Sequence, residues 1–214
     1  MIRAIVFDVD GVLIDSEPIY LDIKMAWLAQ FGLSVTREQM TAYAGERLSL
    51  ALRSIFPGLT PERCGEITDG FAQSTAVTCL EYERILNPRA RELLSSLKRD
   101  GYRMALASSS GVKKLEIFLE SCDLGSYFEF VLNGDMFERM KPDPAIYTRA
   151  AELFGLPPSE CAAVEDSDQG LAAAYNASFY VICKRDDRFH YKQTQAHAWI
   201  DDLSEVLDVL RKTR

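Results

Sequence analysis

The chain opens with Ile2-Arg-Ala-Ile-Val-Phe7, followed at once by Asp8-Val9-Asp10-Gly11. The first run is short, rich in β-forming residues and apolar on both faces, which is typical of a strand buried in a parallel sheet. The acidic run stands where such a strand would end, and Gly11 allows the chain to turn sharply there. This stretch therefore predicts an α/β fold with polar groups at the carboxyl end of its first strand.

Later parts of the chain repeat this alternation of strand and helix. Further apolar runs that resemble strands cover residues 103–107, 128–132, 161–164 and 179–183. Amphipathic stretches with helical spacing cover residues 89–100, 112–121, 144–154 and 169–175. Strands that alternate with helices of this length indicate βαβ units, so we expect a doubly wound parallel-sheet, Rossmann-like core.

Residues 16–84 interrupt the alternation with helical patterns alone. Ser16 and Pro18 have the character of a helix start, and Thr36 with Gln39 predicts a capping box. A connection from a strand to the next helix usually takes about 2–6 residues, far fewer than this segment has. We therefore expect an inserted α-helical cap subdomain at residues 16–84, beside an α/β core of residues 1–15 and 85–214.

Composition and charge exclude several classes of protein. The 214 residues are 48% hydrophobic and 26% charged, which indicates a globular protein rather than a disordered chain or a coiled coil. The 24 Lys and Arg against 32 Asp and Glu give a formal net charge of −8, and an acidic surface repels nucleic acid and anionic lipid. We expect neither nucleic acid nor a membrane as a partner.

The cysteines and the N-terminus predict where the protein works. Five cysteines, an odd number without CxxC spacing, indicate reduced and mostly buried thiols rather than a zinc site or a redox motif. The first residues reach an acid at Asp8 and do not resemble a signal peptide, and no apolar run approaches about 18 residues. We expect a cytoplasmic protein that acts as a monomer, and the sequence leaves an oligomer open.

Polar groups follow four of the predicted strands. They are Asp8 and Asp10, then Ser108 to Ser110, then Lys141, and finally Glu165 with Asp166. Ligands of open α/β sheets bind outside the carboxyl ends of the strands, so we expect all of these groups to meet at one edge.

The acidic members of this set point to a divalent cation. Asp8 and Asp10 stand two residues apart, so on a strand their carboxylates would face the same side and repel each other. A metal ion or a proton would relieve the repulsion and leave one carboxylate as ligand or nucleophile and the other as acid and base. Glu165 and Asp166 add oxygen ligands, and an oxygen-only set favours Mg²⁺.

The remaining members point to an anion. We expect the hydroxyls of Ser108 to Ser110 to cap the helix that follows, whose free N–H groups and positive dipole end attract anions. Lys141, between loop residues stiffened by Pro142 and Pro144, supplies a point charge. Each pattern alone also fits a plain turn, cap or surface loop. Together they predict a site for a divalent cation and an anion such as a phosphate dianion.

Four segments resemble the four motifs of the haloacid dehalogenase superfamily, in the same order and spacing. The segments are Asp8-Val-Asp-Gly-Val-Leu-Ile-Asp15-Ser16, Ser108 after Ala-Leu-Ala, Lys141-Pro-Asp-Pro144, and Val164-Glu-Asp-Ser-Asp-Gln-Gly170-Leu-Ala-Ala-Ala174. The sequence is most similar to the β-phosphoglucomutase-like group of phosphatases and phosphomutases, and the helical insert resembles the small cap of that group.

The resemblance implies chemical roles for the acidic residues. Asp8 would be the nucleophile and form an aspartyl-phosphate, and Asp10 would be the general acid and base. Mg²⁺ would be bound by Asp8, by Asp166 and by the backbone carbonyl of Asp10, with Glu165 as a further ligand or an outer partner.

The resemblance also implies how the substrate is held. Ser108, Ser109 and Lys141 would bind the phosphoryl oxygens, and the cap would close over them. Where the β-phosphoglucomutase pattern has a His after the first motif, this chain has Tyr20, and the Lys of the cap loop is missing. Arg47 in that loop is a candidate substrate contact, although a solvated residue at a helix start is the simpler explanation.

These departures favour hydrolysis. We therefore expect an Mg²⁺-dependent phosphatase acting on a small phosphorylated metabolite, above all a sugar phosphate. The alternative within the group is a β-phosphoglucomutase-like phosphomutase. A dehalogenase fits less well because Asp10 and the acidic pair Glu165-Asp166 are present, and a phosphonate-cleaving enzyme would need a cap lysine, for which Lys24 is the one candidate. A binding module that has lost catalysis is the remaining hypothesis.

Overall fold

The structure is a computed structural model that describes residues 1–45, 47–74, 80–189 and 191–213. The chain forms two compact units. The α/β unit contains Met1–Asp15, Tyr82–Asp186 and Tyr191–Arg214, and the helical unit contains Ser16–Glu81 and Asp187–His190. Within the described residues, no helix has the length and apolar character that a membrane span requires.

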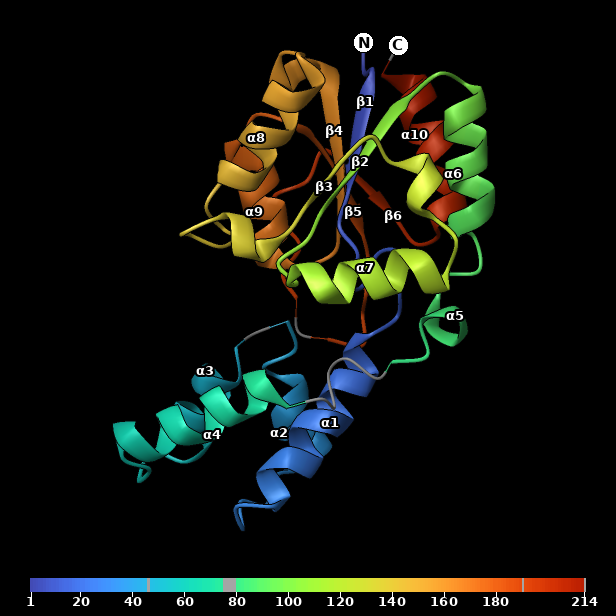
Figure 1. Cartoon of the computed structure of the whole chain (residues 1–214). Helices are drawn as coiled ribbons and strands as arrows, with labels where there is room; N and C mark the ends of the chain where they lie inside the picture. Colours follow the sequence, from blue (N-terminus) through green and yellow to red (C-terminus); the bar gives the residue numbers. More distant parts are fainter. Residues whose placement is uncertain (46, 75–79, 190, 214) are drawn as a thin grey trace. The chain divides into compact units, whose positions relative to one another are not determined.

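A parallel sheet forms the centre of the α/β unit (Figure 1). Its strands are β1 (Ala4–Phe7), β2 (Arg103–Ala107), β3 (Val131–Leu132), β4 (Cys161–Glu165), β5 (Tyr180–Lys184) and β6 (Ala198–Ile200). They lie in the order β3-β2-β1-β4-β5-β6, so the chain winds outward in both directions from the β1–β4 pair. The predicted α/β class with a doubly wound parallel sheet is therefore confirmed.

The edges of the sheet differ most from the sequence prediction. The apolar run at 128–132 contributes only the two residues of β3, which pair with Leu106 and Ala107 of β2. Strand β6 and helix α10 (Val206–Lys212) were not predicted. A strand as short as β6, on the outermost position of a sheet, carries little periodic signal.

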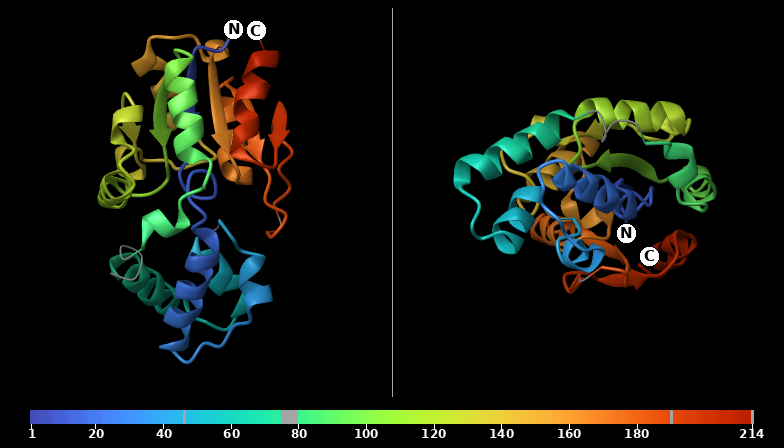
Figure 2. Two further views of the ribbon diagram at one scale, coloured as in Figure 1. Left: turned by 90° about the vertical axis from the view of Figure 1, so that its right-hand side faces the viewer. Right: turned by 90° about the horizontal axis from the view of Figure 1, so that it is seen from below.

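Helices cover both faces of the sheet. The helices of this unit are α5 (Tyr82–Ile85), α6 (Ala90–Arg99), α7 (Val112–Ser121), α8 (Ala145–Phe154), α9 (Asp168–Asn176) and α10, with short 3₁₀ turns η2 (Gly125–Tyr127), η3 (Gly134–Met136), η4 (Pro158–Glu160) and η5 (Leu203–Glu205). Figures 1 and 2 show α8 and α9 on one face and α6 and α10 on the other, with both chain termini at the amino ends of the strands. The carboxyl ends of the strands are therefore the ends away from the termini.

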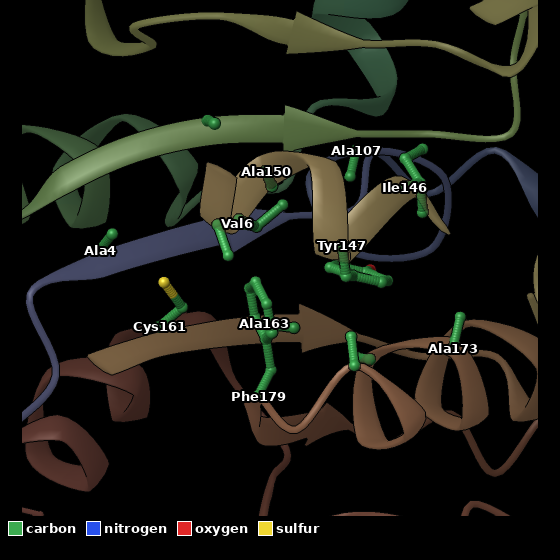
Figure 3. Close-up of a cluster of buried hydrophobic side chains, with 14 of the residues drawn as sticks. Ala4, Val6, Ala107, Ile146, Tyr147, Ala150, Cys161, Ala163, Ala173 and Phe179 are labelled. Atoms are coloured by element: carbon green, nitrogen blue, oxygen red, sulfur yellow. The ribbon is translucent and has the colours of Figure 1, made fainter. Parts of the chain in front are cut away.

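Small side chains let α8 and α9 approach the sheet closely (Figure 3). The cluster between them includes the strand residues Ala4, Ala107 and Ala163, all fully buried. Tyr147 of α8 belongs to the same cluster and packs edge-on against Phe179, with ring centroids 5.4 Å apart. An aromatic ring held this tightly fixes the position of its hydroxyl.

The helical unit has its own small core. Its helices are α1 (Glu17–Ala29), α2 (Arg37–Thr41), α3 (Leu48–Ile55) and α4 (Pro61–Gln73). Trp27 of α1 contacts the ring of Phe71, and its indole N–H donates to the carbonyl of Ile67 at 3.0 Å, which ties α1 to α4. The capping box of Thr36 and Gln39 is confirmed. Ser16 occupies the N-cap of α1 and Pro18 lies in its first turn, so the predicted helix start is confirmed, although Ser16 makes no side-chain capping bond.

The described cysteines are buried free thiols, as predicted. They are Cys64, Cys122, Cys161 and Cys183, and Cys79 lies outside the described residues. Burial raises the pKa of Cys122 and Cys161 to about 11 and that of Cys183 to about 12. Since the thiolate is the reactive form, these three thiols are inert at neutral pH.

Candidate active site

The register of the sheet brings three strand ends to one level. Phe7 of β1 pairs with Leu106 of β2 on one side and with Val164 of β4 on the other. Asp8 is the next residue, and its backbone N–H donates to the carbonyl of Val164 at 3.0 Å. Asp8 therefore stands beside Glu165, at the position between β1 and β4 where the strand order reverses and ligands of such sheets bind.

Lys141 joins two of the predicted carboxylates. Its ammonium lies 2.6 Å from Oδ1 of Asp8 and 2.5 Å from Oε1 of Glu165, and it donates to the carbonyl of Ala107 at 2.9 Å. Burial alone would lower the pKa of Lys141, but the two carboxylates more than offset this and raise it above its ordinary value. A buried positive charge thus lies directly beside Asp8.

Asp8 is itself only 7% exposed. Burial, together with the charges of Glu165 and Asp10, raises the pKa of Asp8 to about 7, although Lys141 acts in the opposite direction. The carboxyl of Asp8 would therefore be partly protonated at neutral pH with these neighbours alone. A cation bound beside it would favour the ionised form that a ligand or nucleophile requires.

The carboxylates of Asp8, Glu165 and Asp166 form a buried group that fits a metal ion. Each offers an oxygen, and these oxygens lie within 4.8 Å of one another. Oε1 of Glu165 accepts from Lys141, whereas Oε2 is buried and has no hydrogen-bond partner among the described residues. Oxygen-only donors and an excess of negative charge over the single ammonium fit a hard divalent cation such as Mg²⁺.

Tyr147 completes the surroundings of Glu165, and the sequence analysis missed it. Its hydroxyl donates to Oε1 of Glu165. Burial and the charge of Glu165 raise the pKa of Tyr147 well above its ordinary value, so the hydroxyl remains a donor. In the sequence, Tyr147 occupies one of the apolar positions of a helix. Its hydroxyl, which needs a hydrogen-bond partner when buried, was the one signal that could have pointed to the site.

Two glycines give the carboxylates their space. Gly11 has φ +79°, and a Cβ at this position would lie 1.9 Å from Oδ2 of Asp166. A Cβ at Gly170 would lie 2.1 Å from Oε2 of Glu165. Any side chain at either position would displace a carboxylate from the group.

Asp10 lies in a different environment from Asp8. Both of its carboxylate oxygens accept from the ammonium of Lys114, at 2.8 and 2.7 Å, and one also accepts from the hydroxyl of Ser110 at 3.0 Å. Strand β1 already ends at Phe7, so the alternation expected of a strand does not extend to Asp10. Asp8 and Asp10 each contact a separate lysine, and the charge of Asp10 still raises the pKa of Asp8, as expected of neighbouring carboxylates.

The serines do not cap helix α7 as expected. Its N-cap is Gly111, which offers no side chain. The hydroxyl of Ser108 instead accepts from the backbone N–H of Ser110 at 3.1 Å, which shapes the turn after β2. Ser108 is 1% exposed, whereas Ser109 is exposed.

The predicted phosphate-binding residues of the α/β unit share one pocket. It is a small hollow with an apolar surface, and it is lined by Ser108, Ser109, Gly134, Phe137, Arg139, Met140, Lys141 and Ile146. Arg47 belongs to the helical unit, where it is exposed and occupies the N-cap of α3 in an extended conformation. Its role as a substrate contact remains a prediction.

Gln193 is a further residue that the sequence analysis missed. Its side-chain amide donates to the carbonyls of Asp166 at 2.6 Å and of Lys184 at 3.2 Å. Its backbone N–H donates to Asp168 at 2.6 Å. These bonds connect the segment before β6 to the turn that carries Asp166 and hold that turn in place.

Comparisons with known proteins agree with this geometry. The family model for haloacid dehalogenase-like hydrolases matches residues 2–178. Hexitol phosphatase B of Escherichia coli (strain K12) is 30% identical over 177 residues, which cover 81% of this chain and 79% of that protein. A phosphorylated carbohydrates phosphatase of Thermotoga maritima is 29% identical over 220 residues, which cover 98% of this chain and 99% of that protein.

A solved structure agrees as well. It is that of a CbbY variant from Rhodobacter sphaeroides in complex with xylulose-(1,5)bisphosphate, with a TM-score of 0.75, 27% identity and 96% of each chain covered. The resemblance inferred from the four sequence motifs is thereby confirmed. This chain belongs to the haloacid dehalogenase-like hydrolase family.

Proposed function

We propose that this protein hydrolyses a small phosphorylated metabolite, above all a sugar phosphate, in an Mg²⁺-dependent reaction that passes through an aspartyl-phosphate on Asp8. The observation that carries the proposal is the buried group of Asp8, Glu165 and Asp166, in which the ammonium of Lys141 contacts Asp8 and Glu165. The relatives compared above are phosphatases by name, and this chain is a phosphatase of the hydrolase family.

The proposed reaction has two steps. A carboxylate oxygen of Asp8 attacks phosphorus, the bond from phosphorus to the ester oxygen breaks, and Asp10 gives its proton to the departing alcohol. Asp10 then takes a proton from a water molecule, which attacks the phosphorus of the aspartyl-phosphate. Inorganic phosphate leaves, and both carboxyl groups return to their initial states.

The cationic side chains of the site, and a metal ion when bound, would stabilise the charge in these steps. Asp8, Asp166 and the backbone carbonyl of Asp10 would hold Mg²⁺, with Glu165 as a ligand or an outer partner, and the ion would neutralise the phosphoryl oxygens. Lys141 would add a charge worth about 4 kcal/mol at 4 Å and an effective dielectric constant of about 20. Ser108 and Ser109 would complete the phosphate-binding pocket.

The relatives and the helical unit support the proposed substrate class. One relative bears the name of a hexitol phosphatase and another that of a phosphatase of phosphorylated carbohydrates, and the CbbY structure holds a bisphosphate sugar. We propose that residues 16–84 act as the cap, with Arg47 as a substrate contact. A phosphomutase is the second candidate, and the missing His and Lys of the mutase pattern count against it.

The proposed setting is the cytoplasm, with a monomer as the working unit. Buried free thiols at the four described cysteines support a reducing compartment. The formal net charge of −8 supports a small metabolite rather than nucleic acid or an anionic membrane as the partner.

The test is a screen of phosphorylated metabolites and p-nitrophenyl phosphate, with and without Mg²⁺. The proposal predicts Mg²⁺-dependent release of inorganic phosphate, which Asp8→Asn abolishes while thermal unfolding remains cooperative. Release of phosphate by Asp8→Asn at a rate near that of the wild type would contradict the nucleophile. Interconversion of isomers without net release of phosphate would identify a mutase instead.

A further inference from the structure

Lys114 stands where the physics of helices disfavours a lysine. It lies in the first turn of α7, where the positive end of the helix dipole favours acidic side chains. The neighbouring Lys113 is exposed and solvated, whereas Lys114 is buried, with only 9% of its surface exposed. A buried positive charge in the first turn of a helix is unfavourable, because it loses its hydration and meets the positive end of the dipole. Residues that contradict such local preferences are concentrated at functional sites.

The contacts of Lys114 explain its position. Its ammonium donates to both carboxylate oxygens of Asp10, at 2.8 and 2.7 Å, and to the hydroxyl of Ser110 at 2.8 Å. The same hydroxyl donates to Asp10 at 3.0 Å. Two donors on two oxygens fix both the position and the plane of the carboxylate.

We propose that Lys114 is a positioning residue for Asp10: when one carboxyl oxygen of Asp10 carries the proton that goes to the departing alcohol, the ammonium of Lys114 holds the group in place through the other oxygen. The inference rests on the proposed function, which assigns Asp10 as the acid. Asp10, Ser110 and Lys114 all belong to the α/β unit. Lys141 cannot substitute for Lys114, because its ammonium is already shared by Asp8 and Glu165.

The proposal predicts a dependence on the leaving group. An alkyl phosphate such as glycerol phosphate releases a strongly basic alkoxide unless an acid protonates it, whereas p-nitrophenolate leaves without a proton. General acid catalysis contributes about 10²–10⁴-fold, and a misplaced catalytic group can lose about 10²-fold. The value of kcat/KM reports the steps up to release of the alcohol, so it isolates this proton transfer from the later hydrolysis.

The experiment compares kcat/KM for glycerol phosphate and p-nitrophenyl phosphate in the wild type, Lys114→Gln, Lys114→Arg and the control Lys113→Gln. We expect Lys114→Gln to lose about 10–100-fold on glycerol phosphate and less than about threefold on p-nitrophenyl phosphate. Lys114→Arg should recover part of the loss because it can still donate to both oxygens, and Lys113→Gln should match the wild type. Equal losses on the two esters, or no loss, would overturn the proposal.

A double variant separates positioning from stability. In an Asp10→Asn background, Lys114→Gln should cause no further loss on glycerol phosphate, because the group that it positions is gone. A further loss there would mean that Lys114 acts through the fold, which would also overturn the proposal. If Asp10→Asn alone left kcat/KM unchanged on both esters, the assignment of Asp10 as the acid would be wrong. Such a result identifies a failure of the proposed function rather than of the Lys114 contact.

Discussion

Asp8 and Asp10 are two residues apart and have opposite surroundings. Asp8 is almost fully buried between other carboxylates and shares one lysine with Glu165. Asp10 has a side chain that is 26% exposed; Lys114 donates to both of its oxygens and Ser110 to one. One carboxylate stands in an excess of negative charge that a metal ion would balance, and the other is balanced by the protein itself.

The difference in surroundings explains how one short turn can carry two carboxyl groups with different chemical roles. Environment, rather than residue type, decides which carboxyl acts as nucleophile and which exchanges protons. Gly11 enables the separation, because the positive φ lets the chain turn directly after Asp10. The following predictions test the comparison, from the largest expected effect to the smallest.

Replacement of the nucleophile has the largest expected effect. Asp8→Asn keeps the shape of the side chain but removes the attacking oxygen anion, so we expect kcat to fall at least about 10³-fold on every substrate. Phosphate release measures the loss, and thermal unfolding checks the fold. A variant that loses activity on alkyl phosphates only would mean that Asp8 and Asp10 do not differ in role.

Replacement of the acid comes next. We expect Asp10→Asn to lower kcat/KM by about 10²–10⁴-fold on an alkyl phosphate, where the leaving oxygen needs a proton. The loss on p-nitrophenyl phosphate should be much smaller. Paired steady-state assays on the two esters measure the difference, and an identical loss on both would contradict the role of Asp10.

Loss of the hydrogen bond from Tyr147 to Glu165 should have a smaller effect, and on metal affinity rather than on the reaction itself. Tyr147→Phe removes the hydroxyl that donates to Glu165 and retains the ring that packs on Phe179. Because outer-shell partners typically contribute 10–100-fold, we expect about a tenfold weaker apparent affinity for Mg²⁺ with little change at saturating metal. Activity as a function of Mg²⁺ concentration measures it.

Tyr82→Phe is the matched control for that measurement. The hydroxyl of Tyr82 is also buried, but it has no hydrogen-bond partner among the described residues. Its removal should leave the affinity for Mg²⁺ unchanged. Equal weakening by both substitutions would mean that the contact of Tyr147 with Glu165 does not support metal binding.

The two serines should show the smallest effects, in a fixed order. Ser108 is buried and accepts from the N–H of Ser110, so Ser108→Ala loosens the turn that reaches Asp10, and we expect KM to rise severalfold, up to about tenfold. Ser109 is exposed, where the loss of a hydrogen bond to the phosphate costs less, and Ser109→Ala should raise KM by about twofold. Steady-state kinetics of the two variants test the order, and a larger effect at Ser109 would reverse our assignment of the pocket.

Much of the fold and of the acidic group could be predicted because the signals are local. Buried parallel strands appear as continuous apolar runs, and polar residues directly after them necessarily meet at one edge of the sheet. The sequence therefore predicted the polar residues of this edge, and the structure brings the carboxylates of Asp8, Glu165 and Asp166 together. The conformation of the turn after β1 was harder to predict, because the periodicity of a strand does not show at which residue the strand ends.

The contacts that were missed are long-range. Lys114 is 104 residues from Asp10 in the sequence, and beside Lys113 it has the pattern of a solvated surface lysine. Its position in the first turn of a helix was the available signal, since that turn disfavours cations. Tyr147 is 18 residues from Glu165 and looks like any core aromatic residue. Propensity and periodicity do not specify the partner of either side chain.

The central claim is that Asp8 becomes covalently phosphorylated. The most direct measurement is to mix radiolabelled p-nitrophenyl phosphate and Mg²⁺ with the Asp10→Asn variant, quench in acid and map the labelled peptide. That substrate needs no acid to release its alcohol, and the variant lacks the base that activates water, so the phosphoryl group should accumulate on the peptide that contains Asp8. Phosphate release with no labelled protein, or a label on any other residue, would contradict the account.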